Sequence, residues 1–569
     1  MQTYGDLCRY SDWVRTEDAL DDDDRIAIRE SIRLMDQSPL FSIILLPAAE
    51  TGFSLAHASV ASIRRQLYPH LELWLPDLPT GIDIRTDRRL RVISTSTADD
   101  VAATFNAALA QTEGDFVLPL PSDAIVAETA LYQIAAALAE CPSADVLYSD
   151  EDRVNAAGLR CTPHFKTDWD PDLAVGRDAI GLLVAYRRAL LEQLGGMRPQ
   201  ADNVALSLYD LSLRAAFGVP PHQIQHIPAV LCHRSLDAQP TIGWDADKAR
   251  EIVRERLAEL DEHATVAPAP LAPFWNRITR NLPDPAPLVS IIVPTRDHAE
   301  LLGPCTESVL SRTDYPALEL LIVDNDSQDP AAVELLRRLS QDPRVRVLPY
   351  QQPFNYSAQN NLAAQEARGE VLLLLNNDTE ALGQDWLREM VSHAMRPDVG
   401  AVGAKLVYPD NRIQHAGMVL GPDIAPQHQL RFADRLDAGP FGELALTRTV
   451  SVVTGACMAL RRAVFFEVGG LNQQLSGNFN DVDLCLRIGD SGYRIVWTPF
   501  AELLHRETAS RGRDDTPEKR TVAAQDARYF ERFWRSLRNS DPFHNPNLVY
   551  GWGAVNLSRP PRRKRPWIR

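Results

Sequence analysis

The sequence predicts an α/β protein built from two copies of one domain, each with a mostly parallel central sheet. Short apolar runs typical of buried strands alternate with helical stretches, beginning at Phe41–Pro47. Helical stretches of this length indicate crossovers between parallel strands. After residue 287 the same order of landmarks recurs, with a period too long for a solenoid.

Composition restricts the class of protein. The 569 residues are 45% hydrophobic and 24% charged, which is typical of a globular chain with two to four domains. No apolar run approaches the roughly 18 residues of a membrane span, and Met1–Asp6 does not begin an export signal. The formal charge of −17 leaves no basic excess for general nucleic-acid binding. The seven cysteines include no C-x-x-C pair, as expected of reduced thiols in a cytoplasm.

Changes in pattern along the chain divide it into five segments. We expect an N-terminal helical segment at 1–40, a first α/β domain at 41–266, a proline-rich linker without regular structure at 267–287, a second α/β domain at 288–513, and a C-terminal helix with a basic tail at 514–569. Asp21–Asp24 is typical of a solvated helix start, because acidic side chains favour the N-terminal end of the helix dipole.

Landmarks of the first copy recur in order in the second. The corresponding pairs are Asn106 and Asn361, Gly114 and Gly369, Asp123 and Asp378, Asp210 and Asp483, and His233 and His505. Chance does not keep so many landmarks in one order.

The two copies differ where chemistry is expected. Pro121 stands in the place of Asn376, and Leu208 stands in the place of Asp481. A leucine can neither accept a proton nor bind a metal. The second copy is therefore the better candidate for an active site, and we expect the first to brace it or to hold an acceptor.

The strand Val371–Leu375 ends abruptly in Asn376, Asn377 and Asp378. In an open α/β sheet, ligands bind at the carboxyl ends of the strands. Asp378 there could hold a divalent ion such as Mg²⁺ together with the phosphates of a substrate. A turn residue or a helix cap is the alternative for this aspartate taken alone.

Two earlier strands of the second copy also end in small polar and acidic groups. These residues are Pro294, Thr295 and Asp297 after the strand at 288–293, and Asp324 and Asn325 after the strand at 318–323. Such groups at neighbouring strand ends would form a cradle for a base and a ribose. Two capped turns are the alternative interpretation.

Six motifs follow one another along the second copy. They are Ser290–Thr295, Val323–Ser327, Pro353–Asn361, Leu375–Glu380, Asn480–Arg487 and Leu504–Gly512. Together they resemble family 2 glycosyltransferases, and most closely bacterial enzymes of O-antigen and related surface polysaccharides, including rhamnosyltransferase-like members. The resemblance covers about residues 288–513 and, more weakly, 41–233, which marks the first copy as degenerate.

The resemblance implies a nucleotide-sugar-binding GT-A fold, a divalent metal (Mg²⁺ or Mn²⁺) and inversion at the anomeric carbon. It implies donor contacts at Pro294, Thr295, Asp297, Asp324, Asn325, Asn361, Asn377 and Arg511, and metal ligands at Asp378 and His505. Asn376 departs from the common Asp-x-Asp form. Its neutral oxygen is expected to bind metal more weakly, so that the donor's diphosphate supplies more of the ligands.

Sugar transfer with inversion needs a carboxylate that takes the proton of the acceptor hydroxyl. By resemblance Asp481 is this base, and Asp483 supports the helix that starts there; N-terminal caps for both are the alternative. Gly455 and Ala456 are expected on the acceptor side, because glycine lets a substrate approach the backbone closely. A packing turn explains these two residues almost as well.

A histidine and an arginine near the end of the second copy complete the candidate site. A neutral imidazole at His505 can complete a metal's shell, and Arg511 can grip a diphosphate. A structural histidine is the alternative. His415–Gly417 is a further candidate for the wall of the cleft.

The C-terminal part is predicted as a docked helix, Pro517–Asn539, followed by the basic tail Arg559–Arg569. A membrane-surface role is the less favoured alternative for the helix. The tail is expected either to meet anionic phospholipid or to remain solvated and disordered. The acidic segment Tyr148–Arg153 is expected to form a solvated loop.

The predicted function is an inverting glycosyltransferase. It would move a sugar from a UDP-, dTDP- or GDP-linked donor to a glycan or lipid-linked acceptor in cell-surface polysaccharide synthesis, in the cytoplasm and in peripheral contact with the inner membrane face. The alternative is a non-catalytic carbohydrate-binding or scaffolding protein of a polysaccharide-assembly complex. A nucleotidyltransferase is disfavoured, because the chain lacks a G-x-G-x-x-G or G-x-x-x-x-G-K phosphate loop.

Overall fold

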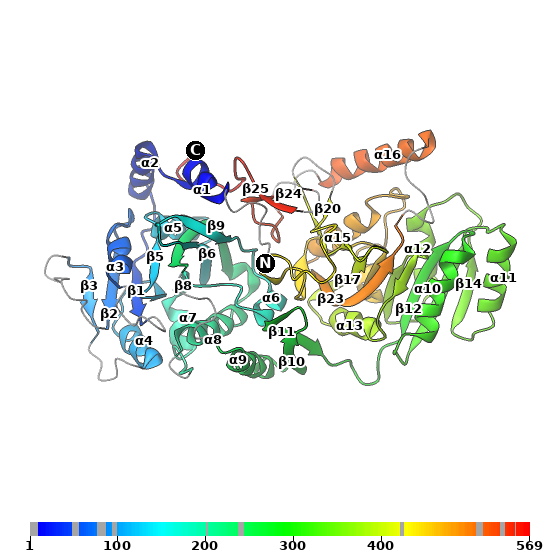
Figure 1. The fold of residues 1–569 in the computed structure, drawn as a ribbon, viewed down its shortest axis with the longest axis horizontal. Helices are drawn as coiled ribbons and strands as arrows, with labels where there is room; N and C mark the ends of the chain where they lie inside the picture. Colours follow the sequence, from blue (N-terminus) through cyan, green and yellow to red (C-terminus); the bar gives the residue numbers. More distant parts are fainter. Residues whose placement is uncertain are drawn as a thin grey trace.

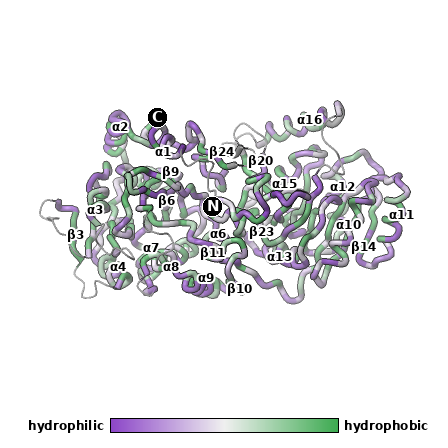
Figure 2. The backbone as a smooth tube through the Cα atoms, viewed as in Figure 1, coloured by the Kyte–Doolittle hydropathy of each residue, from purple (hydrophilic) through white to green (hydrophobic). Residues whose placement is uncertain are grey.

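The computed structural model describes residues 9–47, 56–76, 87–93, 100–200, 203–236, 244–421, 426–507, 516–534, 541–551 and 554–568. Two α/β units lie side by side, and the N-terminal helices and the C-terminal strands both lie against the first unit (Figure 1). Hydrophobic segments concentrate inside both units, whereas peripheral segments such as the N-terminal helix α2 are largely hydrophilic (Figure 2).

The first unit is built on a nine-stranded sheet in the order β3-β2-β1-β4-β8-β6-β9-β5, with β7 paired to β6. Its strands are β1 (Phe41–Leu46), β2 (Leu71–Leu75), β3 (Leu90–Val92), β4 (Phe116–Pro121), β5 (Ala124–Val126), β6 (Val146–Val154), β7 (Arg160–His164), β8 (Val184–Arg187) and β9 (Ile224–Ser235). Its helices are α3 (Ala56–Arg64), α4 (Val101–Leu109), α5 (Ala130–Glu140), α6 (Pro171–Gly176), α7 (Arg188–Gln193), α8 (Val204–Phe217) and α9 (Ala246–Glu259).

The second unit repeats this topology in a ten-stranded sheet with the order β14-β13-β12-β15-β22-β17-β23-β16. Its strands are β12 (Val289–Thr295), β13 (Leu318–Asp324), β14 (Val345–Pro349), β15 (Val371–Leu375), β16 (Thr379–Ala381), β17 (Val399–Val407), β18 (Ile413–His415), β21 (Arg448–Val450), β22 (Cys457–Arg461) and β23 (Arg494–His505). Beside it lies the small sheet of β19 (Met418–Val419) and β20 (Gln427–His428). Its helices are α10 (Ala299–Ser311), α11 (Pro330–Leu339), α12 (Tyr356–Glu366), α13 (Trp386–Ala394), α14 (Arg462–Glu467) and α15 (Asn480–Asp490).

The predicted fold class of two tandem α/β domains is confirmed. In each unit the first four strands of the sheet order are parallel, and the remaining strands pair in a mixed manner. Helices cover both faces, so a central strand such as β15 is buried along its whole length. This burial on two faces explains why the strand is a continuous apolar run rather than an alternating one.

A buried polar network is repeated in the two units. It consists of Gly114, Ser42 and Glu72 in the first and Gly369, Ser290 and Glu319 in the second. In the second unit the Gly369 N–H donates to Ser290 Oγ over 2.8 Å, and Ser290 donates to Glu319 over 2.6 Å. A Cβ on either glycine would lie within 2.6 Å of the serine oxygen, so only glycine fits.

The segment predicted as an irregular linker instead begins with a hairpin. Strands β10 (Ala264–Ala269) and β11 (Ala272–Arg280) pair antiparallel. The prolines did not prevent pairing, because both strands of a two-stranded ribbon are edges, and an edge strand tolerates a residue without an N–H. The prediction that residues 267–287 lack regular structure was therefore wrong for residues 267–269 and 272–280.

The two units meet at a buried carboxylate on α6 of the first unit. Asp172 lies 2.6 Å from Arg396 and 2.7 Å from Arg494 of the second unit, and 3.2 Å from Arg280 of the hairpin. Although burial opposes ionisation, these three guanidinium groups hold the pKa of Asp172 well below its usual range. The interface is thus fixed by a charge cluster that contains groups from both units.

The basic tail packs against the N-terminal segment, which comprises α1 (Tyr10–Trp13), η2 (Val14–Asp18) and α2 (Asp22–Arg33). Arg563 pairs with Asp18 and lies over the Trp13 ring, and the Trp567 indole N–H donates to Asp24 over 2.6 Å. The expectation of a solvated or lipid-bound tail is therefore wrong for these side chains. Sequence periodicity gave no sign of pairing between the two ends of the chain.

The acidic segment Tyr148–Arg153 belongs to strand β6 rather than to a solvated loop. Asp152 accepts a hydrogen bond of 2.7 Å from the Tyr10 hydroxyl, and Asp150 accepts one of 2.8 Å from Asn545. Asn545 precedes the C-terminal strands β24 (Leu548–Gly551) and β25 (Ala554–Leu557). The buried carboxylates thus anchor both chain ends on the first unit.

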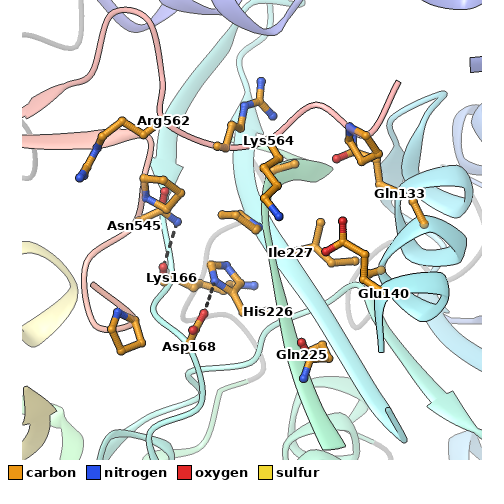
Figure 3. A pocket seen from close by; sticks show the side chains of 18 of the residues that line it. Gln133, Glu140, Lys166, Asp168, Gln225, His226, Ile227, Asn545, Arg562 and Lys564 are labelled. Atoms are coloured by element: carbon orange, nitrogen blue, oxygen red, sulfur yellow. Dashed lines mark hydrogen bonds and ion pairs between the residues drawn. The ribbon is translucent and has the colours of Figure 1, made fainter. Parts of the chain in front are cut away.

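A cavity of about 620 Å³ lies between the C-terminal segment and the first unit. Figure 3 shows Asn545 pointing to Lys166, and His226 pointing to Asp168, along its wall. None of the residues that line it belongs to the predicted catalytic set.

Helix α16 (Pro517–Trp534) docks on the second unit as predicted. Asp526 accepts from the Asn478 N–H over 3.0 Å, which accounts for an acid in an otherwise apolar stripe. Trp534 donates to Asp483 over 2.9 Å. The end of the predicted helix, 535–539, lies outside the described residues, and within the described ranges no helix has the length and apolarity of a membrane span.

Candidate active site

The two predicted metal ligands of the second unit lie together. Asp378 follows β15, and the next residue, Thr379, is paired across the sheet with His505 at the end of β23. This antiparallel pairing brings His505 Nε2 to 3.3 Å from Asp378 Oδ1. Both side chains are buried.

A glutamine sets the orientation of the histidine. His505 Nδ1 lies 3.3 Å from the side-chain oxygen of Gln414. Because this oxygen only accepts, Nδ1 is the donor, and Nε2 is the ring atom that faces Asp378. In its neutral form the ring would offer the Nε2 electron pair there. Two electron-pair donors that face each other fit a divalent cation between them.

The protein supplies only part of such a coordination shell. Among the described residues, no group of three His, Cys, Asp or Glu side chains is arranged to hold a metal. Mg²⁺ is commonly bound by one or two protein ligands plus the phosphates of its substrate. Asp378 and His505 therefore fit a metal that is shared with a diphosphate.

The predicted base lies at the start of α15. Asp481 accepts hydrogen bonds from the Gly455 N–H over 3.0 Å and from the Val482 N–H over 2.9 Å. Burial raises the pKa of Asp481 above its usual range, although these two donors and Thr454 oppose the rise. A carboxylate with a raised pKa is a stronger base, as proton abstraction requires.

The predicted acceptor-side residues adjoin this base. A Cβ on Gly455 would lie 3.5 Å from Asp481 Cβ and 3.2 Å from the Tyr356 hydroxyl, which donates to the Gly455 carbonyl. The neighbouring Ala456 is buried, and its carbonyl accepts from the Asn376 N–H over 3.0 Å. The turn at Gly455 thus connects the predicted base to the strand end that carries the predicted metal ligand.

Three strand ends bring the predicted donor cradle together. Thr295, which follows Pro294 at the end of β12, is in parallel register with Asp324 at the end of β13. Asn377, after β15, donates to the Thr295 hydroxyl over 3.0 Å. These side chains lie at the carboxyl edge of the sheet, where α/β folds bind ligands.

Two aspartates of the cradle also cap turns. Asp324 accepts from the Ser327 hydroxyl over 2.5 Å. Asp297 accepts from the Gln328 and Asp329 N–H groups over 2.7 and 2.8 Å, which lowers the pKa of Asp297. Asp324 and Asp297 therefore do cap turns, as the alternative interpretation expected, and these turns also shape the cradle.

The amide of Asn325 is engaged within the fold. Its nitrogen donates to the Tyr350 and Gln352 carbonyls, and its oxygen accepts from Gln359. This side chain holds the loop after β14, and a contact of Asn325 with a donor stays a prediction.

Asn361 likewise exchanges two hydrogen bonds with the Leu471 backbone, over 2.7 and 2.9 Å. Asn106 makes the same pair of bonds to Met197 in the first unit. A contact repeated in both copies is a packing landmark, which explains why it is part of the sequence repeat. Arg511 lies outside the described residues.

Sequence reasoning missed Gln414 and His428, and left His415 as a residue of the cleft wall. His415 is fully buried behind the site, with Nδ1 at 2.8 Å from His428 Nδ1. Burial, together with the nearby His428 and His505, keeps the pKa of His415 well below its usual range. No residue spacing signals these contacts, because they join strands that are distant in sequence.

The first unit has a different pair of groups at the corresponding strand end. Ala124, after Asp123, is in register with Arg234, so Arg234 and not His233 holds the position of His505. Arg234 Nε donates to Asp123 over 2.7 Å. His233 instead bonds to Asp152, and the predicted correspondence of His233 with His505 is corrected accordingly.

Comparisons with known proteins identify a family and several relatives. The family described as "Glycosyl transferase family 2" matches residues 290–469. An uncharacterised protein, y4gI, of Sinorhizobium fredii is 37% identical over 94% of this chain and 60% of its own length. The O-antigen biosynthesis protein RfbC of Myxococcus xanthus is 36% identical over 94% of this chain and 42% of its own length.

A shorter relative matches one part of the chain. The N-acetylglucosaminyl-diphospho-decaprenol L-rhamnosyltransferase of Mycobacterium tuberculosis is 30% identical over 41% of this chain and 79% of its own length. The chain spans 60% and 42% of the two longer relatives.

Proposed function

Because the chain belongs to glycosyltransferase family 2, we propose that its second unit moves a sugar, with inversion, from a nucleotide-sugar donor to a glycan or lipid-linked acceptor. One arrangement carries the proposal. Gly455 binds Asp481, and the next residue, Ala456, binds Asn376 at the strand end where Asp378 faces His505. A base and a diphosphate-binding centre are the two parts that such a transfer needs.

The donor would lie along the carboxyl edge of the second sheet. Thr295, Asp324 and Asn377 would hold its nucleoside portion, and its diphosphate would lie toward Asp378 and His505. A bound Mg²⁺ or Mn²⁺ would offset the negative charge of the departing diphosphate.

The acceptor hydroxyl would approach from the side of Gly455. As its oxygen forms a bond to the anomeric carbon and the bond from that carbon to the diphosphate breaks, Asp481 takes the hydroxyl proton. The hydrogen bonds from Gly455 and Val482 hold the carboxylate for this transfer. Attack from the face opposite the diphosphate inverts the configuration.

The names of two relatives support a cell-surface polysaccharide as the product. One relative is named for O-antigen biosynthesis, and another for transfer of L-rhamnose to a diphospho-decaprenol acceptor. We propose a hexosyl or deoxyhexosyl donor linked to UDP, dTDP or GDP. A lipid-linked acceptor would place the reaction at the inner face of the cytoplasmic membrane.

We further propose that the first unit has no transfer activity and braces the second or holds its acceptor. Leu208 is buried on α8 where the base would stand, and Arg234 supplies a fixed positive charge where a metal would bind. The charge cluster at Asp172 supports the bracing role.

The test is a panel of UDP-, dTDP- and GDP-sugars, assayed for hydrolysis and for transfer with Mg²⁺ or Mn²⁺. The proposal expects turnover with at least one donor, and its loss in Asp481→Asn. Binding of a glycan without turnover of any donor would favour the non-catalytic alternative.

A further inference from the structure

Strand β18 lies behind the candidate site and contacts both of its halves. The metal half consists of Asp378 and His505, and the base half of Asp481 and the Thr454–Gly455 turn. Its residues Gln414 and His415 are buried, at 2% and 0% exposure. Successive side chains of a strand point to opposite sides. One strand can therefore support two different groups with two neighbouring residues.

The first of these residues contacts the metal half. The Gln414 oxygen lies 3.3 Å from His505 Nδ1, and His505 Nε2 lies 3.3 Å from Asp378. An acceptor at Nδ1 selects the tautomer that leaves Nε2 as a ligand, and it also fixes the rotation of the ring. Without this acceptor the ring can turn away or carry its proton on the ligating nitrogen.

The second residue contacts the base half. His415 Nε2 accepts from the Gly417 N–H over 3.3 Å and from the Thr454 N–H over 3.4 Å. Since Nε2 accepts, Nδ1 carries the proton and donates to His428 over 2.8 Å. The two histidines thus form a fixed, directed pair.

The turn that His415 supports is the one that holds the base. Thr454 precedes Gly455, whose N–H donates to Asp481 over 3.0 Å. Gly417, the other donor to His415, has φ +86°, and a Cβ there would lie 2.8 Å from Val450. The loop after β18 therefore packs tightly against the strand that leads to Thr454.

We propose that Gln414 and His415 are positioning residues with divided tasks. Gln414 holds His505 in the orientation that serves the metal, and His415, backed by His428, holds the Thr454–Gly455 turn that orients Asp481. Neither residue touches the substrate. This inference rests on the proposed function of the second unit, and it goes beyond it by assigning what keeps the two halves of the site in register.

The first test measures Mn²⁺ binding directly, by electron paramagnetic resonance of free Mn²⁺ with UDP, dTDP or GDP present. Gln414→Leu removes the acceptor and should weaken Mn²⁺ binding by about 10-fold, the low end of effects of such supporting residues. Gln414→Glu keeps an oxygen acceptor and should recover most of the affinity. Wild-type affinity in folded Gln414→Leu, or no recovery in Gln414→Glu, would overturn the assignment.

The second test separates the base half by kinetics. His415→Gln should lower kcat by about 10-fold while the donor KM and Mn²⁺ affinity stay near wild type, because only the orientation of the base is lost. His428→Asn, which changes the outer member of the pair, should do the same to a smaller extent and guards against a misfolded His415 variant. The division of tasks would be overturned if kcat were unchanged in both His415→Gln and His428→Asn. It would also be overturned if Mn²⁺ affinity fell as much as kcat in both variants.

The two proposals fail in distinguishable ways. If the wild type turns over no nucleotide-sugar, the proposed function fails, whereas the Mn²⁺ titration of Gln414→Leu still decides the role of Gln414. If the wild type is active and the Gln414 and His415 variants match it in both measurements, only the present inference fails.

Discussion

The two units share one topology and one set of packing landmarks, yet their strand ends hold different chemistry. In the second unit Asp378 faces His505, and in the first unit Asp123 faces Arg234. A guanidinium group is always charged and neutralises the carboxylate by itself. The same aspartate after a buried strand therefore faces an imidazole in one unit and a permanent positive charge in the other, so only the second strand end is left open to an added cation.

The first unit also differs in what covers its sheet. Tyr10 from the N-terminal segment and Asn545 from the C-terminal segment bond to carboxylates on β6. Carboxylates of the first unit thus hold both chain ends. In the second unit Ser451 also bonds to Asp541 of the C-terminal segment, but other buried polar groups gather around Asp378 and Asp481.

The largest expected effect concerns the joint between the units. Asp172→Asn leaves three largely buried guanidinium groups without their shared anion, and loss of one partner of a buried ion pair costs about 3–5 kcal/mol of unfolding free energy. Urea unfolding would measure this loss. The matched control is Asp398→Asn, whose carboxylate contacts Arg396 and Arg494 but is 51% exposed, and it should have a much smaller effect.

The same carboxylate predicts a pH dependence of stability. The pKa of Asp172 is lowered in the folded state, so its contribution is fully present above the usual carboxyl pKa. The contribution is lost as the pH falls from there through the lowered pKa. Asp172→Asn should therefore flatten the acid side of the stability curve, and an unchanged curve would contradict the role of the cluster.

The second prediction removes the base. Asp481→Asn keeps the size of the side chain but has one acceptor oxygen for the two backbone N–H groups of Gly455 and Val482. It should lower turnover by about 10²-fold or more, while donor binding changes little. The control Asp490→Asn, at the exposed far end of the same helix, should leave turnover unchanged. Initial rates and donor binding by calorimetry would measure the two effects, and full activity in Asp481→Asn would remove this residue from the mechanism.

The raised pKa of Asp481 predicts how the rate depends on pH. The carboxylate must be ionised to take a proton, so the rate should fall as the pH drops through the raised pKa. The acid limb should therefore lie above the usual range of an aspartate. A pH–rate profile whose acid limb is the same in Asp481→Asn would contradict the assignment.

A smaller effect is expected at the chain ends. Arg563→Ala removes the ion pair with Asp18 and should lower the unfolding free energy by about 1.5–3 kcal/mol without changing turnover. The exposed neighbour Lys564→Ala is the control.

Because Arg563 and Arg565 are engaged with the N-terminal segment, sedimentation with anionic liposomes should be the same with and without residues 559–569. Loss of sedimentation on deletion would restore the lipid-binding alternative.

The fold and the pairing of Asp378 with His505 were predictable, because they follow from local apolar runs and from motifs kept in one order. The exchange of His505 for Arg234 was not, since it depends on the register between β5 and β9, which the sequence does not reveal. Asn325 and Asn361 were predicted as donor contacts, but the same residue type serves equally well to hold a loop. Gln414 and His428 were missed because their contacts join distant strands.

The most direct test of the division between the units is product formation by Asp123→Ala and Asp378→Ala, measured side by side over a Mn²⁺ titration. We expect Asp123→Ala to keep wild-type activity and metal response, because Asp123 pairs with Arg234. Asp378→Ala should lose on the order of 10-fold or more in its response to Mn²⁺, since even supporting residues of metal sites contribute that much. If Asp123→Ala instead abolishes a distinct transfer that Asp378→Ala retains, the first unit is a second active site and the account is contradicted.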